Sequence, residues 1–91
     1  MSLKCLDASF NRLSRFEEVA LVTNLRQLNV SHNCLTSLKD VDMLRDLEFL
    51  NASCNKITSI SGLGKLKKLR HLYLFGNKIK NLEELCCISS M

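Results

Sequence analysis

Apolar residues recur along this chain in blocks of constant length. Leucine stands at positions 3, 25, 47 and 69, and aligning the chain on these residues gives LKCLDASFNRL, LRQLNVSHNCL, LEFLNASCNKI and LRHLYLFGNKI. The common pattern is LxxLxLxxNxL, in which the sixth position also accepts alanine or valine. A fixed period of this length is typical of architectures built from stacked units. We therefore predict a single domain over residues 1–91 with four repeats, at 3–24, 25–46, 47–68 and 69–90.

Within each repeat the pattern predicts one strand and one helical turn. The fourth and sixth positions are apolar and alternate with outward positions, as in a half-buried strand, so Leu28 and Val30 should point inward and Gln27 outward. The fourteenth, seventeenth and twentieth positions are apolar in every repeat, a spacing that favours a helical or 3₁₀ turn. The expected fold is an α/β, right-handed solenoid with a parallel sheet on its concave side and these short turns on its convex side.

An asparagine occupies the ninth position of every repeat. At this point the chain leaves the strand and turns, so its backbone N–H and C=O groups lose their partners in the sheet. A carboxamide has both donor hydrogens and an acceptor oxygen, and it can satisfy such groups. We therefore interpret this column as structural rather than as a binding site; its members are Asn11, Asn33, Asn55 and Asn77.

These repeats resemble the leucine-rich-repeat family, over essentially the whole chain from Leu3 to Ser90. The constant length is similar to a class that includes the nuclear regulatory subunit of protein phosphatase 1 and the leucine-rich light chain of outer-arm dynein. The resemblance implies a non-catalytic scaffold or adaptor that binds proteins, in the cytoplasm, in the cilium or centrosome, or in the nucleus. A regulatory subunit of a protein phosphatase and a component of a ribonucleoprotein are the alternatives.

The ends of the repeat array lack the polar capping segments that such stacks normally carry. The first repeat begins at Leu3, and the last apolar position of the fourth repeat is Ile88. End repeats without caps expose apolar surface. We therefore expect a fragment of a longer array, with further repeats or a capping segment at either end.

The outward strand positions, namely the third, fifth and seventh of each repeat, are where we expect a protein partner to bind. Successive copies of such a position lie ~4.8 Å apart in a sheet. In the third and fourth repeats these positions gather aromatic residues, which are favoured anchors at protein interfaces. Alternatively, Phe75 turns toward the core while Phe49 and Tyr73 cover the end of the stack. The predicted site on the concave face comprises Phe49, His71, Tyr73, Phe75, Asn29 and Asn51.

Charge adds one candidate surface. The net charge is +4, and the excess comes mainly from a basic patch made of Lys65, Lys67, Lys68 and Arg70. We interpret this patch as a solvated face in preference to a site for an acidic protein or RNA. Aromatic residues do not alternate with it as they do in nucleic-acid platforms, so nucleic acid is disfavoured as a partner. No apolar run reaches the ~18 residues that a membrane span needs.

The remaining residues predict no chemistry. Five scattered cysteines favour a reducing compartment over a disulfide framework. His32, Cys34 and Cys54 fall close together in the repeat register, but a structural zinc site needs four ligands and a fourth is not evident. Neither a phosphate-binding glycine loop nor a nucleophile beside a base emerges. We therefore predict no catalytic site, no metal and no cofactor.

Overall fold

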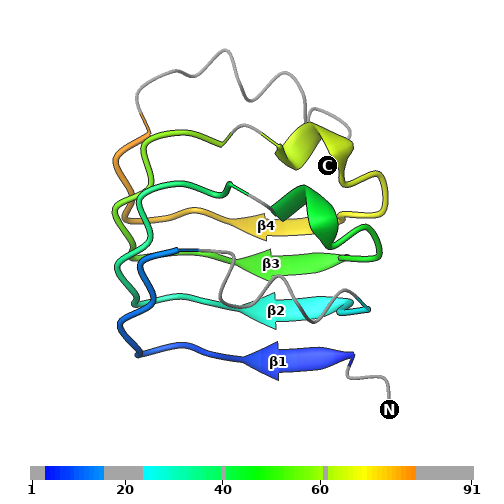
Figure 1. Ribbon diagram of the computed structural model, residues 1–91, viewed down its shortest axis with the longest axis horizontal. Helices are drawn as coiled ribbons and strands as arrows, with labels where there is room; N and C mark the ends of the chain where they lie inside the picture. The colour runs from blue at the N-terminus through cyan, green and yellow to red at the C-terminus, as the bar shows by residue number, and fades with distance from the viewer. Residues whose placement is uncertain (1–3, 16–23, 40, 61, 80–91) are drawn as a thin grey trace.

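The computed structural model describes residues 4–15, 24–39, 41–60 and 62–79. Four short strands form one parallel sheet in chain order: β1 (Cys5–Asp7), β2 (Gln27–Asn29), β3 (Phe49–Asn51) and β4 (His71–Tyr73). Each residue pairs with the one at the same repeat position in the next strand, so Cys5 faces Gln27 and Gln27 faces Phe49. Figure 1 shows the strands as parallel rungs of one stack. The predicted parallel sheet is confirmed.

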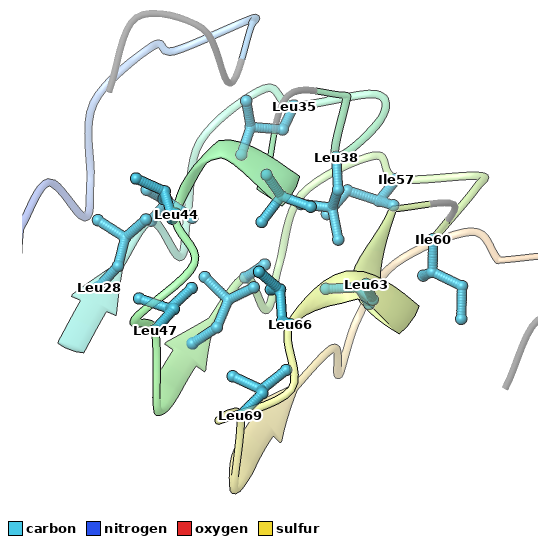
Figure 2. Close-up of a cluster of buried hydrophobic side chains, with 14 of the residues drawn as sticks. Leu28, Leu35, Leu38, Leu44, Leu47, Ile57, Ile60, Leu63, Leu66 and Leu69 are labelled. Atoms are coloured by element: carbon cyan, nitrogen blue, oxygen red, sulfur yellow. The ribbon is translucent and has the colours of Figure 1, made fainter. Parts of the chain in front are cut away.

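Two 3₁₀ helices lie across the core from the sheet, η2 (Val41–Met43) and η3 (Leu63–Lys65) (Figure 2). Gly62, at the start of η3, has a φ of 98°, and a Cβ there would lie 3.4 Å from Val41 Cγ1. Glycine adopts this left-handed backbone without strain, and the distance to Val41 is ordinary van der Waals contact. The corresponding turns of the first and fourth repeats lie outside the described residues. Within the described part of the chain, no helix has the length and apolar character needed to cross a bilayer.

One apolar core fills the space between the strands and the 3₁₀ helices (Figure 2). Leu28 and Leu50 are 0% exposed, whereas Leu6 and Leu72, at the same position of the first and last repeats, are only half-buried. Burying one such side chain stabilises a fold by about 1.5–3 kcal/mol, so these apolar columns hold the three-residue strands together. The buried apolar residues are Leu25, Leu28, Val30, Leu35, Leu38, Val41, Leu44, Leu47, Leu50, Ala52, Ile57, Ile60, Leu63, Leu66 and Leu69.

The asparagine column joins each repeat to the one before it. The Asn55 Nδ2 donates to the Ala52 carbonyl of its own repeat and to the Val30 carbonyl of the preceding repeat, both at 3.0 Å. Its Oδ1 accepts the backbone N–H of Leu35 at 3.0 Å. Asn33 repeats this arrangement one unit earlier. Because Asn55 is only 6% exposed, these bonds satisfy backbone groups that water does not reach.

Candidate functional site

Three aromatic side chains meet on the outward face of β3 and β4. The strand register pairs Phe49 with His71 and places Tyr73 beside them. The Phe49 ring centroid lies 6.2 Å from that of His71 and 5.5 Å from that of Tyr73, with interplanar angles of 49° and 54°. Tilted contacts of this kind suit the electrostatics of aromatic rings. The structure therefore brings together three of the four aromatic residues that the sequence places in one neighbourhood.

Phe75 follows this cluster and points into solvent. Its side chain is 79% exposed, and Tyr73 is 48% exposed. The alternative in which Phe75 packs into the core is therefore wrong. We use the name aromatic face for the surface made of Phe49, His71, Tyr73 and Phe75. The equivalent outward positions of β1 and β2 carry a thiol and small polar side chains.

A shallow hollow adjoins the aromatic face over the first three strands. It is lined by Cys5, Leu6, Asp7, Gln27, Leu28, Asn29 and Phe49. Asp7 Oδ1 accepts hydrogen bonds from Ser9 Oγ at 2.6 Å and from the Ser9 backbone N–H at 3.0 Å. The hydroxyl bond chiefly, and then the backbone bond, lower the pKa of Asp7 below its ordinary value of 3.8. The hollow therefore carries a fixed negative charge at neutral pH.

The seventh position departs from the expected outward orientation in the second repeat. Ser31 is only 6% exposed, and its Oγ donates to Asn29 Oδ1 at 2.7 Å. The same Asn29 oxygen accepts the Ser31 backbone N–H at 3.0 Å, and Asn51 does so for Ser53 at 3.1 Å. Asn29 and Asn51 are both half-buried. The side-chain oxygens of Asn29 and Asn51, two residues of the predicted binding site, are therefore engaged in closing the turn after each strand.

Acidic side chains of the preceding repeat face much of the basic patch. Lys68 Nζ lies 2.9 Å from Asp46 Oδ1, and Lys65 Nζ lies 3.8 Å from Asp42 Oδ2. The Lys68 hydrogen bond first, and its charge second, lower the pKa of Asp46. Glu48 shares a surface depression with the rest of the patch, Lys67, Lys68 and Arg70. The sequence predicts four grouped cations, and the structure places carboxylates among them.

The loops that leave the strands hold Phe10, which the sequence analysis did not single out. We call this surface the loop flank: residues 8–15, 30–37, 52–59 and 76–79, at the left of Figure 1. Phe10 and His32 stack there with ring centroids 4.3 Å apart and an interplanar angle of 7°. Both residues have a left-handed backbone, as do Cys54 and Gly76 at the same repeat position. Of these four residues, only the glycine signals such a conformation from the sequence.

The cysteines and the histidine of the loop flank do not form a metal site. Among the described residues, no group of three or more His, Cys, Asp or Glu side chains is placed to hold a metal ion. The thiols of Cys5, Cys34 and Cys54 are free. His32 contacts the Phe10 ring instead.

Comparison with family models identifies the repeats. A model described as two copies of leucine-rich repeats matches residues 45–87, and a model of a single leucine-rich repeat matches residues 24–44. Together the two matches run without a break over residues 24–87, which include β2, β3 and β4. None of the curated proteins compared with the chain matches it.

Solved structures with the same fold include two internalins of Listeria monocytogenes. Internalin C2 has a TM-score of 0.84 and 31% sequence identity, over 91% of this chain and 37% of that chain. A second internalin, inlF, has a TM-score of 0.74 and 22% identity, over 98% of this chain and 33% of that chain. The chain thus spans about a third of the length of either structure. The likeness to a phosphatase subunit and to a dynein light chain stays a prediction.

Proposed function

The chain belongs to the leucine-rich-repeat family, and we propose that it is a non-catalytic protein-binding module whose partner docks on the aromatic face. Solenoids of stacked repeats present one extended surface along their strands, and such folds are typically interaction modules. One observation carries the proposal. Phe49 contacts both His71 and Tyr73 on the outward face of the strands, and the exposed Phe75 follows Tyr73 by two residues.

The energetics favour a covered state of this face. The Phe75 ring is 79% exposed, so the fold gains little from it. Covering roughly 150 Å² of aromatic surface contributes about 4 kcal/mol before the costs of ordering the two partners. Contact between Phe49 and Tyr73 already restricts both rings, which reduces the entropy that docking would cost.

We propose a scaffold or adaptor role for this module. The ciliary or centrosomal setting and the role of a phosphatase regulatory subunit stay predictions of the family resemblance, as do the cytoplasmic and nuclear locations. The ribonucleoprotein alternative depends on the basic patch. Two of its cations, Lys65 and Lys68, form ion pairs with aspartates, which supports protein rather than RNA as the partner.

The aromatic face is tested by site-specific photocross-linking in cells, with a photoreactive phenylalanine in place of Phe75. Met43 is the matched control position, because it is also a large exposed apolar residue, 55% exposed, but lies in η2 across the core. We expect a defined protein adduct from position 75 and none from position 43. The partner recovered in this way is then titrated against purified variants.

We expect Phe49→Ala combined with Tyr73→Ala to weaken binding of that partner by about ten-fold or more, as for anchor residues of other interfaces. Phe75→Ala, at a 79% exposed position, separates lost binding from lost folding. Circular dichroism checks that each variant is folded. If the double variant binds as the wild type does, the aromatic face is not the docking surface.

A further inference from the structure

A column of cations runs along the loop flank. Arg12, Lys56 and Lys78 occupy the tenth position of the first, third and fourth repeats, and Cys34 occupies it in the second. All four side chains are exposed. These cations lie in the loops that follow the strands, whereas Phe49, His71 and Tyr73 of the aromatic face lie in β3 and β4.

Backbone hydrogen bonds fix the spacing of this column. The Lys56 N–H donates to the Leu35 carbonyl at 2.8 Å, and the Lys78 N–H donates to the Ile57 carbonyl at 2.9 Å. Each bond ties a tenth position to the eleventh position of the preceding repeat. Lys56 and Lys78 are therefore held about one strand spacing, ~4.8 Å, apart at their backbones, and Arg12 is about two spacings from Lys56 because Cys34 lies between them.

Among the described residues, no carboxylate pairs with these cations. Residues 8–15, 30–37, 52–59 and 76–79 contain no Asp or Glu. Within the described part of the chain, Arg12, Lys56 and Lys78 form no ion pair, whereas Lys65 and Lys68 of the basic patch pair with aspartates. Arg12, Lys56 and Lys78 therefore give the loop flank a positive charge that no carboxylate of the described residues balances.

The Phe10–His32 stack lies two residues before this column. Phe10 has a φ of 58° and is 76% exposed. A left-handed backbone costs roughly 1–2 kcal/mol for a residue with a side chain. Because the ring is largely in water, burial in the fold does not offset that cost. The left-handed backbone recurs at His32, Cys54 and Gly76, so it belongs to the repeat, and the feature specific to this part of the stack is the exposed aromatic pair.

We infer that the loop flank is a second docking surface, and that its occupant is an acidic segment of a protein partner. Carboxylates of that segment meet Arg12, Lys56 and Lys78, and one apolar side chain covers the Phe10–His32 stack. An extended segment directs alternate side chains to one face roughly 6.6 Å apart, a distance that flexible lysine side chains accommodate. A single aromatic stack beside one row of cations does not provide the series of stacking sites that single-stranded nucleic acid uses.

The test is fluorescence anisotropy with a labelled peptide that alternates glutamate with serine and carries one tryptophan. The full chain is titrated at low salt and again at high salt. Lys56→Glu combined with Lys78→Glu reverses two charges on the loop flank. The matched control, Lys67→Glu combined with Arg70→Glu, makes the same change in net charge on the basic patch.

We expect the loop-flank variant to lose about ten-fold in affinity, with less than about two-fold for the control, because only the first pair meets the carboxylates. Phe10→Asn should weaken binding of the tryptophan peptide but not of the same peptide with serine in its place, since asparagine tolerates the left-handed backbone. The aromatic-face variant Phe49→Ala/Tyr73→Ala should bind the peptide normally, which separates this inference from the proposed function.

Three results would overturn the inference. The first is no binding of the peptide at low salt, and the second is an equal loss in the loop-flank variant and its control. The third is that a single-stranded oligonucleotide of equal charge binds more tightly than the peptide and that this binding is lost in Lys56→Glu/Lys78→Glu. That result would make the loop flank a nucleic-acid site.

Discussion

At the scale of single residues, the eighth position of each repeat sets the direction of the turn after the strand. Phe10, His32 and Cys54 have φ values of 58°, 56° and 59°, and Gly76 has 75°. Only glycine adopts this region without strain. At Gly76 an added Cβ would lie 3.3 Å from Cys54 Sγ, so adjacent repeats also approach closely here. The fold thus retains a backbone strain at three residues that the asparagine bonds next to them hold in place.

We expect Cys54→Gly to raise the free energy of unfolding by about 0.5–1 kcal/mol, because relief of the left-handed strain exceeds the entropy gained by the unfolded chain. Cys34→Gly is the matched control, since Cys34 is also a free thiol but has no positive φ. There the same substitution should lower the free energy of unfolding by a similar amount. Urea unfolding measures both. Equal effects of the same sign would show that strain at Cys54 is not significant.

At the scale of elements, ion pairs connect the segments around η2 and η3. Lys68 reaches Asp46 one repeat earlier, and Lys65 reaches Asp42. Arg45 adds a bond within its own turn, from Nε to the Asp42 carbonyl at 2.7 Å. Exposed pairs of this kind contribute little energy each. Their effect is chiefly to neutralise Lys65 and Lys68, whereas Arg12, Lys56 and Lys78 of the loop flank pair with no carboxylate among the described residues.

The Asp46–Lys68 pair predicts a specific acid dependence of stability. The Lys68 hydrogen bond lowers the pKa of Asp46 below 3.8, so the unfolded chain binds a proton more readily than the folded chain does. This stabilisation is fully present above the unfolded pKa and is lost as pH falls through the lower, folded pKa. Urea midpoints measured between neutral pH and acid should therefore fall less steeply in Lys68→Gln. If the urea midpoint of Lys68→Gln falls with decreasing pH as steeply as that of the wild type, the pair is not a source of stability.

At the scale of the whole molecule, each repeat is held by its immediate neighbours, and the interior repeats differ from the ends. Val30 and Ala52 are 0% exposed, while Ala8 and Leu74, at the same repeat position, are half-buried. The hydrogen bonds between strands are nevertheless alike. The Ala8 N–H donates to the Asn29 carbonyl and the Val30 N–H donates to the Asn51 carbonyl, each at 2.8 Å. Stability should therefore vary along the stack even though bond geometry does not.

We expect the Ala8 amide to exchange its hydrogen with deuterium at least about ten-fold faster than the Val30 amide under native conditions. The reason is that Ala8 is half-buried, whereas Val30 is 0% exposed. Amide exchange followed by NMR measures both sites in one sample. Equal protection would show that the repeats open only as one cooperative unit.

The sequence predicts the scaffold well because the scaffold is periodic. Inward positions such as Leu28 and Val30 repeat at one register, and a parallel sheet of identical units follows from that spacing alone. Interactions between repeats are harder to predict, because their partners are far apart along the chain. The Lys68–Asp46 pair spans a sequence separation of 22 residues and is found only when acidic and basic residues are compared column by column.

Surface features were predicted less completely, for reasons that differ between residues. Phe49 and Tyr73 follow from strand alternation, which fixes the face each side chain occupies. The burial of Ser31 could not be predicted, because it depends on its bond to Asn29 after the strand has ended. Lys56 and Lys78 do not stand out in a net charge of +4, and they form a pattern only along the tenth position of the repeats, where Arg12 joins them.

The equal length of the repeats has a consequence for how such a protein can change. Each strand pairs residue for residue with the next, so loss of residues 25–46 would bring Cys5 opposite Phe49 without altering any inward column. The Phe10–His32 stack would disappear, because Cys54 would become the neighbour of Phe10. Duplication or excision of whole units thus rewrites the recognition surface in a single step, while the interior stays compatible with either arrangement.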